Sequence, residues 1–588
     1  MSYPSSPTPG YASADSSLTL PRVSSFGAIR RDSWQSISES PYSFGPASRL
    51  STLTDKFSLS PDPRQWGSDL SPDLIEPDDH LHNPGVGYTR LGRRHDSVVH
   101  YARGLVNLGC LLVLLVTLLL LFIGYPVITY RKEWSSIGSS LGGTNSTGQV
   151  PSIGNFGLID LDTPEEARTR TSIRDGSNMI LVFSDEFNTN GRTFYPGDDP
   201  YWEAEDLHYW ATNNLEWYDP EAVTTANGSL IITFSEKFNH DLNYQGGLIS
   251  SWNKFCFTGG YIETSVKLPG VNNVAGMWPA VWTMGNLGRA GYGASLDGMW
   301  PYTYDSCDVG TAPNQTINGQ PVTAVIDGDH AYGGALSYLS GQRLSRCTCD
   351  GESHPGPKHP DGTYVGRSAP EIDIFEAQVG GDILTGEVSQ SSQWAPFNRA
   401  YLWDNSSANE VIADPTISRQ NNFIGSALQQ ATSVVTNTNQ LCYELIQDCY
   451  SVYGFEYKPG YDDAYITWVS DSKVSWTFNV AGMGPDPTVE VSARPVPQEP
   501  MYIIINLGMS RNFGAIDFEH LTFPNHMYVD YIRVYQDVDR INIGCDPPDF
   551  PTADYINKYI GAYTNPNLTT WTSDYGQPFP KNSLITPC

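Results

Sequence analysis

The stretch Pro370-Glu-Ile-Asp-Ile-Phe-Glu-Ala377 places three carboxylates among apolar residues, in a pattern that predicts a buried strand. On a regular strand Glu371 and Asp373 point to one face and Glu376 to the other, because side chains alternate with a period of two. A one-residue bulge between Asp373 and Glu376 places all three on one face, and bulges occur where a strand re-aims a functional side chain. The sequence therefore predicts a bulged strand that presents three carboxylates to one cleft.

Three carboxylates on one face can carry out glycosyl transfer. Two carboxyl groups roughly 5 to 5.5 Å apart support a retaining double displacement, in which one attacks the anomeric carbon and the other protonates the departing oxygen. Crowding of like charges raises one pKa, so that an acid stays protonated near neutral pH, and an intervening Asp can position the nucleophile. The alternative is a solvated acidic strand edge, in which Ile372, Ile374 and Phe375 are hard to place.

Glu371-Ile-Asp-Ile-Phe-Glu376 resembles the catalytic motif of glycoside hydrolase family 16 in its bulged, laminarinase-like form. The resemblance covers about residues 180 to 540 and implies a beta-jelly-roll sandwich of two sheets with an open substrate cleft. It also implies that Glu371 is the nucleophile, Asp373 its helper and Glu376 the general acid/base. Three further segments resemble the family's flanking and closing strands: Gly276-Met-Trp-Pro-Ala-Val-Trp282, Ser389-Gln-Ser-Ser-Gln-Trp-Ala-Pro396 and Phe523-Pro-Asn-His-Met-Tyr-Val-Asp-Tyr-Ile-Arg-Val-Tyr535.

The whole chain has a long Ser/Pro-rich N-terminal segment, one apolar run at residues 104–128, a Cys-bearing insertion at residues 286–369 and a C-terminus that ends in Cys588. This organisation resembles that of the fungal beta-1,6-glucan synthesis-associated type II membrane proteins. This kinship implies a retaining beta-glucan hydrolase or transglycosidase that helps to build the cell wall and needs no cofactor. The sequence leaves open whether the glycosyl group passes to water or to another sugar, and which linkage is involved. The alternative is a non-catalytic glycan-binding scaffold that assists a glucan synthase in the secretory pathway. Loss of a carboxylate would support that alternative, and none is lost.

The globular region, expected to begin near Ile180, consists of short beta-branched and aromatic runs separated by Gly, Pro, Asn and Asp, which predicts an all-beta sandwich. One short helix is expected near Ile424 to Val435. Residues 286–369 form an insertion that is expected to remodel the cleft rim. Residues 541–588 form a C-terminal extension that is expected to be disulfide-linked.

Aromatic and amide side chains near the motif are candidates for binding sugar, because an aromatic face can pack against a pyranose. We expect Trp278, Trp282, Trp394 and Asn506 to bind substrate, with His526 as a weaker candidate, although Trp282 suits the core equally well. Trp210 and Trp217 are expected to belong to the core.

The N-terminal part predicts a membrane anchor. Residues 1–103 are rich in Ser, Pro and Arg and are expected to form a disordered cytosolic tail. Residues 104–128 form an apolar run of roughly 20 residues that is long enough to span a bilayer, and residues 129–179 suit a flexible lumenal stalk. Four Arg precede the run, which predicts a cytosolic N-terminus and a lumenal or extracellular domain. Ser-Pro pairs suit trafficking or regulatory partners and start at Ser6, Ser40, Ser60 and Ser71.

Cysteines and glycosylation sequons agree with this topology. Eight of the nine cysteines follow the apolar run, an even number that predicts four disulfides in an oxidising compartment. Cys347-Thr-Cys349 could be a metal site, but one intervening residue favours a structural disulfide, so no metal is expected. The net charge of −30 makes nucleic acid an unfavourable partner. All five sequons follow the run, at Asn145, Asn227, Asn314, Asn405 and Asn567.

Overall fold

The computed structural model describes residues 108–109, 111–118, 122 and 158–588. Residues 108–109 and 111–118 are helical. The tail predicted at 1–103, most of the span predicted at 104–128 and the stalk up to residue 157 lie outside the described residues. Among the residues that the structure does describe, no helix is long and apolar enough to cross a bilayer.

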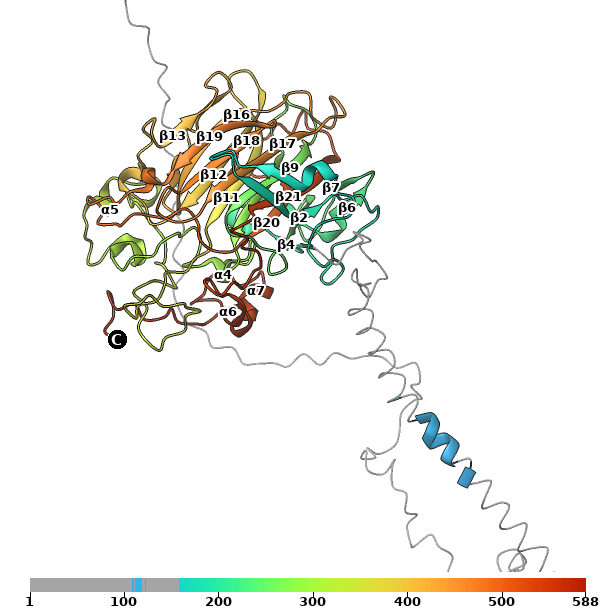
Figure 1. The fold of residues 1–588 in the computed structure, drawn as a ribbon, viewed down its shortest axis with the longest axis horizontal. Coiled ribbons are helices and arrows are strands. Elements are labelled where there is room, and N and C mark those ends of the chain that lie inside the picture. Colours follow the sequence, from blue (N-terminus) through green and yellow to red (C-terminus); the bar gives the residue numbers. More distant parts are fainter. Residues whose placement is uncertain (1–107, 110, 119–121, 123–157) are drawn as a thin grey trace, which may run out of the picture. The chain divides into compact units, whose positions relative to one another are not determined.

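Two beta-sheets dominate residues 158–588, which confirms the predicted all-beta sandwich (Figure 1). The first sheet has the order β1 (Thr169–Thr171), β2 (Asn178–Asp185), β21 (Asn525–Asp537), β9 (Gly260–Lys267), β17 (Ser451–Lys458), β18 (Tyr465–Ser470), β19 (Lys473–Asn479) and β13 (Glu410–Ile412), with β6 (Val223–Ala226) and β7 (Ser229–Phe234) joined at β21.

The second sheet carries the carboxylate motif on a central strand. Its order is β14 (Ser418–Gln420), β16 (Gln429–Asn437), β12 (Thr385–Trp394), β11 (Glu371–Gly380), β10 (Trp278–Gly285), β20 (Met501–Gly508), β8 (Tyr244–Ser250), β5 (Glu216–Tyr218) and β4 (Leu207–His208), with β15 (Gly425–Ser426) on β16 and β3 (Glu203–Ala204) on β8. The pairs in both sheets are antiparallel except for β5 with β8.

Helices are short and lie mainly in the insertion and the C-terminal extension. The α-helices of residues 158–588 are α4 (Gly293–Leu296), α5 (Thr323–Ile326), α6 (Ala553–Lys558) and α7 (Ile560–Thr564). The 3-10 helices of the same region are η4 (Glu165–Arg168), η5 (Trp210–Thr212), η6 (Pro220–Ala222), η7 (Val309–Thr311), η8 (Pro313–Gln315), η9 (His330–Tyr332), η10 (Arg399–Tyr401) and η11 (Val480–Met483).

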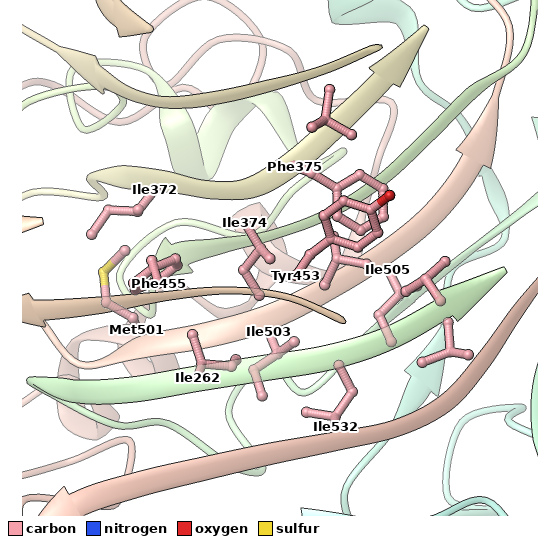
Figure 2. Close-up of a cluster of buried hydrophobic side chains, with 14 of the residues drawn as sticks. Ile262, Ile372, Ile374, Phe375, Tyr453, Phe455, Met501, Ile503, Ile505 and Ile532 are labelled. Carbon is pink, nitrogen blue, oxygen red and sulfur yellow. The ribbon is translucent and has the colours of Figure 1, made fainter. Parts of the chain in front are cut away.

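The main core lies between the two sheets and explains the apolar half of the motif. Ile372, Ile374 and Phe375 of β11 are fully buried there, against residues of β20, β17, β9 and β21 (Figure 2). Burying side chains of this size stabilises the fold by about 1.5–3 kcal/mol each. The inner face of β11 is therefore apolar, and its carboxylates face the other way.

Two expectations about secondary structure were wrong. The segment expected to form a helix near 424 to 435 contains β15 and β16 instead, because the run from Thr432 to Thr436, in which four of five residues are beta-branched, pairs with β12. Ordered structure also begins before residue 180. β1 pairs with β2, and Ser172 donates a hydrogen bond to Glu456 over 2.8 Å, so residues 158–179 belong to the domain rather than to a stalk.

Four disulfides form, as the cysteine count predicted. Two of them fasten the C-terminal extension, through Cys256–Cys545 and Cys349–Cys588. The second joins the extension to the insertion. Hydrogen bonds accompany this bridge, from the Cys349 amide to the Lys581 carbonyl and from the Ser583 amide to the Cys347 carbonyl, both 2.8 Å long. The extension is therefore part of the domain.

Removal of the bridge between insertion and extension in a Cys349→Ala, Cys588→Ala variant is expected to lower the free energy of unfolding by about 2–4 kcal/mol. The reason is that this disulfide closes a long loop, with a sequence separation of 239 residues, and so strongly restricts the unfolded chain. Chemical denaturation measures the change. The matched control removes Cys442–Cys449, which closes a separation of only 7 residues and should cost less. An equal or larger loss in the control would contradict this prediction.

Candidate active site

A bulge in β11 turns all three carboxylates of the motif toward one face of the sheet, where Glu371 and Glu376 line a cleft and Asp373 is buried beside them. Asp373 lies opposite Ser391 of β12 and Glu376 opposite Ser389, so three steps along β11 match two steps along β12. The predicted bulge between Asp373 and Glu376 is thereby confirmed. The extra residue lets Ile374 and Phe375, which are neighbours in sequence, both enter the core.

Each carboxyl group has its own hydrogen-bond donor. The indole Nε1 of Trp300 donates to Glu371 Oε2 over 2.7 Å, and that of Trp278 donates to Glu376 Oε1 over 3.2 Å. Asp373 is the most enclosed of the three. Its Oδ2 accepts from Ser391 Oγ at 2.6 Å and from Gln393 Nε2 at 3.1 Å.

Burial and mutual repulsion keep protons on this site near neutral pH. Loss of hydration raises the pKa of Asp373 to about 6 and, together with the charge of Asp373, raises the pKa of Glu376 to about 8. The pKa of Glu371 is raised well above its usual range, first by burial and then by the charges of Asp373 and Glu376. The carboxyl groups of Glu371 and Asp373 also interact with each other, and this interaction favours one shared proton on the pair.

The cleft around these groups has a volume of about 700 Å³, which is suited to a ligand of several sugar units. Its floor is the second sheet, and its walls come from the insertion, the C-terminal extension and the segments around Trp210, Phe423 and Phe513. Among the described residues that line it, none is Lys or Arg, while Trp, Tyr, Phe, Asn, Gln and Ser are frequent. Such a surface suits a neutral polyhydroxylated ligand better than an anionic one.

Three of the four predicted substrate-binding residues line this cleft. Trp278 packs flat against Phe513, with ring centroids 4.2 Å apart. Trp282 also lies on the floor of the cleft, where its Nε1 donates to Asn506 Oδ1 over 2.8 Å. Trp282 is therefore both a buried core residue and part of the cleft lining. Asn506 in turn donates to the hydroxyl of Tyr218 over 3.2 Å.

The prediction for Trp394 was wrong. Alternation along β12 turns Ser389, Ser391 and Gln393 toward the cleft and Trp394 toward the core. Its side chain is fully buried, and its Nε1 donates to Thr432 Oγ1 over 3.0 Å. Trp394 therefore packs the sandwich and does not face a ligand.

The structure also shows where the weaker candidates lie relative to the cleft. Trp210 lines the cleft and is 42% exposed, although we expected it in the core. Trp217 lies outside the lining and stacks on His240. His526 does not line the cleft either, and it hydrogen-bonds with Glu444 at 2.5 Å.

The insertion and the extension supply groups that local sequence patterns did not indicate. Trp300 comes from the insertion and reaches Glu371 across 71 residues of sequence. Thr569 and Thr570 of the extension line the same wall. This wall is firmly held, because the Trp571 amide donates to Asp297 Oδ2 over 2.9 Å and the Arg343 guanidinium lies 3.7 Å from the Trp571 ring centroid.

Comparison with known proteins identifies the family. The family model described as beta-glucan synthesis-associated protein SKN1/KRE6/Sbg1 matches residues 69–588. The chain belongs to this family. It is 42% identical over 525 residues to beta-glucan synthesis-associated protein KRE6 of Saccharomyces cerevisiae, covering 88% of this chain and 69% of the relative. It is 43% identical over 542 residues to SKN1 of Candida albicans, covering 88% of this chain and 67% of the relative.

Solved structures that resemble the chain include two glucanases. One is the catalytic domain of an endo-1,3-beta-glucanase (laminarinase) from Thermotoga petrophila, with 19% identity, a TM-score of 0.34 and coverage of 62% of this chain and 99% of that one. The other is an endo-beta-1,3-glucanase from Pyrococcus furiosus, with 17% identity, a TM-score of 0.36 and coverage of 63% and 98%.

Replacement of Trp300 by Phe is expected to raise the pKa of Glu371 further, because the indole N–H stabilises the ionised carboxylate and Phe has no donor. Infrared difference titration of the carboxyl bands measures the shift, with Glu371→Gln to assign the band. Trp217→Phe is the matched control, because its indole donates to Asp206 outside the cleft. A Glu371 titration that is the same in both variants would contradict the role of Trp300.

Proposed function

We propose that this chain is a retaining hydrolase or transglycosidase acting on beta-glucan during cell-wall beta-1,6-glucan biosynthesis. The observation that carries the proposal is the bulge of β11, which puts Glu371, Asp373 and Glu376 on one face, with Glu371 and Glu376 lining the cleft and Asp373 buried beside them. Membership of the beta-glucan synthesis-associated family supports beta-glucan as the polymer. The absence of Lys and Arg among the described lining residues fits a neutral glucan.

In the first half of the reaction Glu371 attacks the anomeric carbon while Glu376 gives its proton to the departing glycosidic oxygen. Glu371 is ionised for this attack when the proton it shares with Asp373 lies on Asp373. The Trp300 indole then stabilises the charge on Glu371. The products are a covalent glycosyl ester on Glu371 and a free glucan end, and Glu376 is left ionised.

In the second half Glu376 takes a proton from the hydroxyl that attacks the ester. If the hydroxyl belongs to water, the result is hydrolysis, and if it belongs to another sugar, the result is transfer. Attack breaks the ester bond, restores Glu371 and returns a proton to Glu376. A role in building a wall favours the sugar as acceptor.

The floor of the cleft supplies contacts for the glucan. Trp278 and Trp282 offer aromatic rings, and Asn506 offers an amide that is held by Trp282 and Tyr218. Behind them Glu216 accepts a hydrogen bond from Asn214 over 2.7 Å, and burial raises the pKa of Glu216 to about 8. These contacts would fix the sugar ring relative to the carboxylates.

We also propose that the domain works on the lumenal or extracellular side of a membrane, anchored by residues 104–128. Four disulfides support an oxidising compartment. The sequon asparagines at 227, 314, 405 and 567 are exposed, as glycosylation requires, while Asn145 lies outside the described residues.

Replacing Glu376 by Gln is expected to reduce turnover of beta-glucan oligosaccharides by about 10²- to 10⁴-fold, because Gln cannot donate or accept the transferred proton. Replacing Glu371 by Gln should reduce turnover by at least the same factor, because no covalent ester can form. Product analysis with a labelled acceptor glucan measures both hydrolysis and transfer. Glu387→Gln is the control, since Glu387 of β12 pairs with Arg419 outside the cleft. Turnover that is equal in all three variants would contradict the assignment.

Activity is expected to be greatest between about pH 6 and pH 8. It falls at lower pH as the Glu371 and Asp373 pair gains a second proton, and at higher pH as Glu376 loses its own. In Trp278→Phe the alkaline limb should move to higher pH, because the lost indole donor had lowered the pKa of Glu376. Rates measured across pH test this, and an unmoved or lowered alkaline limb would contradict it.

A further inference from the structure

Exposed aromatic and aliphatic side chains extend the cleft beyond the carboxylates. Tyr338 of the insertion is 58% exposed, Phe423 is 48% exposed and Leu428 is 40% exposed, and all three line the cleft. Tyr332 stands next to Tyr338, with ring centroids 5.1 Å apart. We call Tyr338, Phe423 and Leu428 the aromatic shelf.

The backbone under the shelf is fixed although the rings are exposed. The Tyr338 amide donates to the Ala427 carbonyl over 2.6 Å, so the insertion is joined to the segment before β16. The Phe423 amide donates to Asn421 Oδ1 over 3.0 Å. With the backbone fixed, only the side-chain torsions of the rings remain to be ordered when a ligand binds.

A row of small polar side chains connects the shelf to the carboxylates. Ser389 of β12, opposite Glu376, shares a hydrogen bond of 2.9 Å with Ser433 of β16. Ser433 in turn accepts from Asn421 Nδ2 over 3.0 Å. All of these side chains except Glu376 are uncharged, and Asn421 precedes Phe423 by two residues. The row therefore leads across the sheet from the acid to the shelf.

The chemistry of the shelf and the polar row selects a neutral glucan. Exposed rings pack against the C–H faces of pyranoses, while serine and amide groups bind hydroxyls. An anionic polymer or a lipid headgroup would need basic side chains, and no described residue of the lining is Lys or Arg. Continuity with the carboxylate cleft indicates that the same glucan chain occupies both.

We propose that the aromatic shelf is an additional glucan-binding platform, which holds glucosyl units several positions away from the bond that reacts. This inference rests on the proposed function. The shelf gives the insertion a function, because Tyr338 comes from residues 286–369. Binding at the shelf makes the enzyme selective for long glucan chains.

The test measures binding in the full-length chain carrying Glu371→Gln, so that no turnover occurs. Calorimetry with beta-glucan oligosaccharides from trisaccharide to decasaccharide gives affinity against length. Tyr338→Ala and Phe423→Ala are each expected to weaken binding of the longest oligosaccharides by about 3- to 10-fold and to leave the trisaccharide unchanged. Tyr338→Phe keeps the ring and should bind like the parent.

Phe238→Ala and Tyr195→Ala are matched controls, because both rings are exposed, at 70% and 45%, outside the cleft lining. Shelf variants that bind every length like the parent would overturn the shelf and leave the proposed function standing. If the shelf variants weakened binding of oligosaccharides of every length by the same factor, that result would also overturn the role of the shelf. A parent that binds no oligosaccharide of any length would instead count against the proposed function and, with it, the shelf.

Discussion

Three carboxyl groups on one buried strand cannot all be ionised together, because like charges close to each other repel strongly where water is largely excluded. The site depends on how this repulsion is resolved. The strand bulge brings the groups onto one face, a shared proton reduces the charge of Glu371 and Asp373, and Glu376 keeps its own proton up to about pH 8. Indole and hydroxyl donors then stabilise the charge that remains.

The insertion and the C-terminal extension complete this site. Trp300 reaches Glu371 from the insertion, and the extension holds the same wall through Cys588 and Trp571. A disulfide, a stacked guanidinium and a second hydrophobic cluster, which the insertion and the extension share with the second sheet, hold the geometry of this wall. The parts of the chain that lie outside the two sheets are therefore part of the functional unit rather than an appendage.

Much of the site could be predicted from sequence because its signals are local. The spacing of Glu371, Asp373 and Glu376 indicated a bulge, and an even cysteine count indicated four disulfides. Trp300 could not be found in this way, because its contact with Glu371 depends on the path of a loop 71 residues away. Trp394 was misplaced for a related reason, since the face of β12 that meets the core is set by its pairing with β11 and β16.

The central claim is that Glu371 forms a covalent bond to the sugar, and mass spectrometry of a trapped intermediate tests it most directly. The probe is an activated 2-deoxy-2-fluoro beta-glucan oligosaccharide. Its fluorine slows both formation and breakdown of the glycosyl ester, whereas its good leaving group speeds formation alone, so the ester accumulates. We expect one glycosyl group per chain, attached to Glu371 in the peptide that also carries Asp373 and Glu376. A chain that acquires no label while it turns over beta-glucan, or a label on Glu376 instead, would contradict the account.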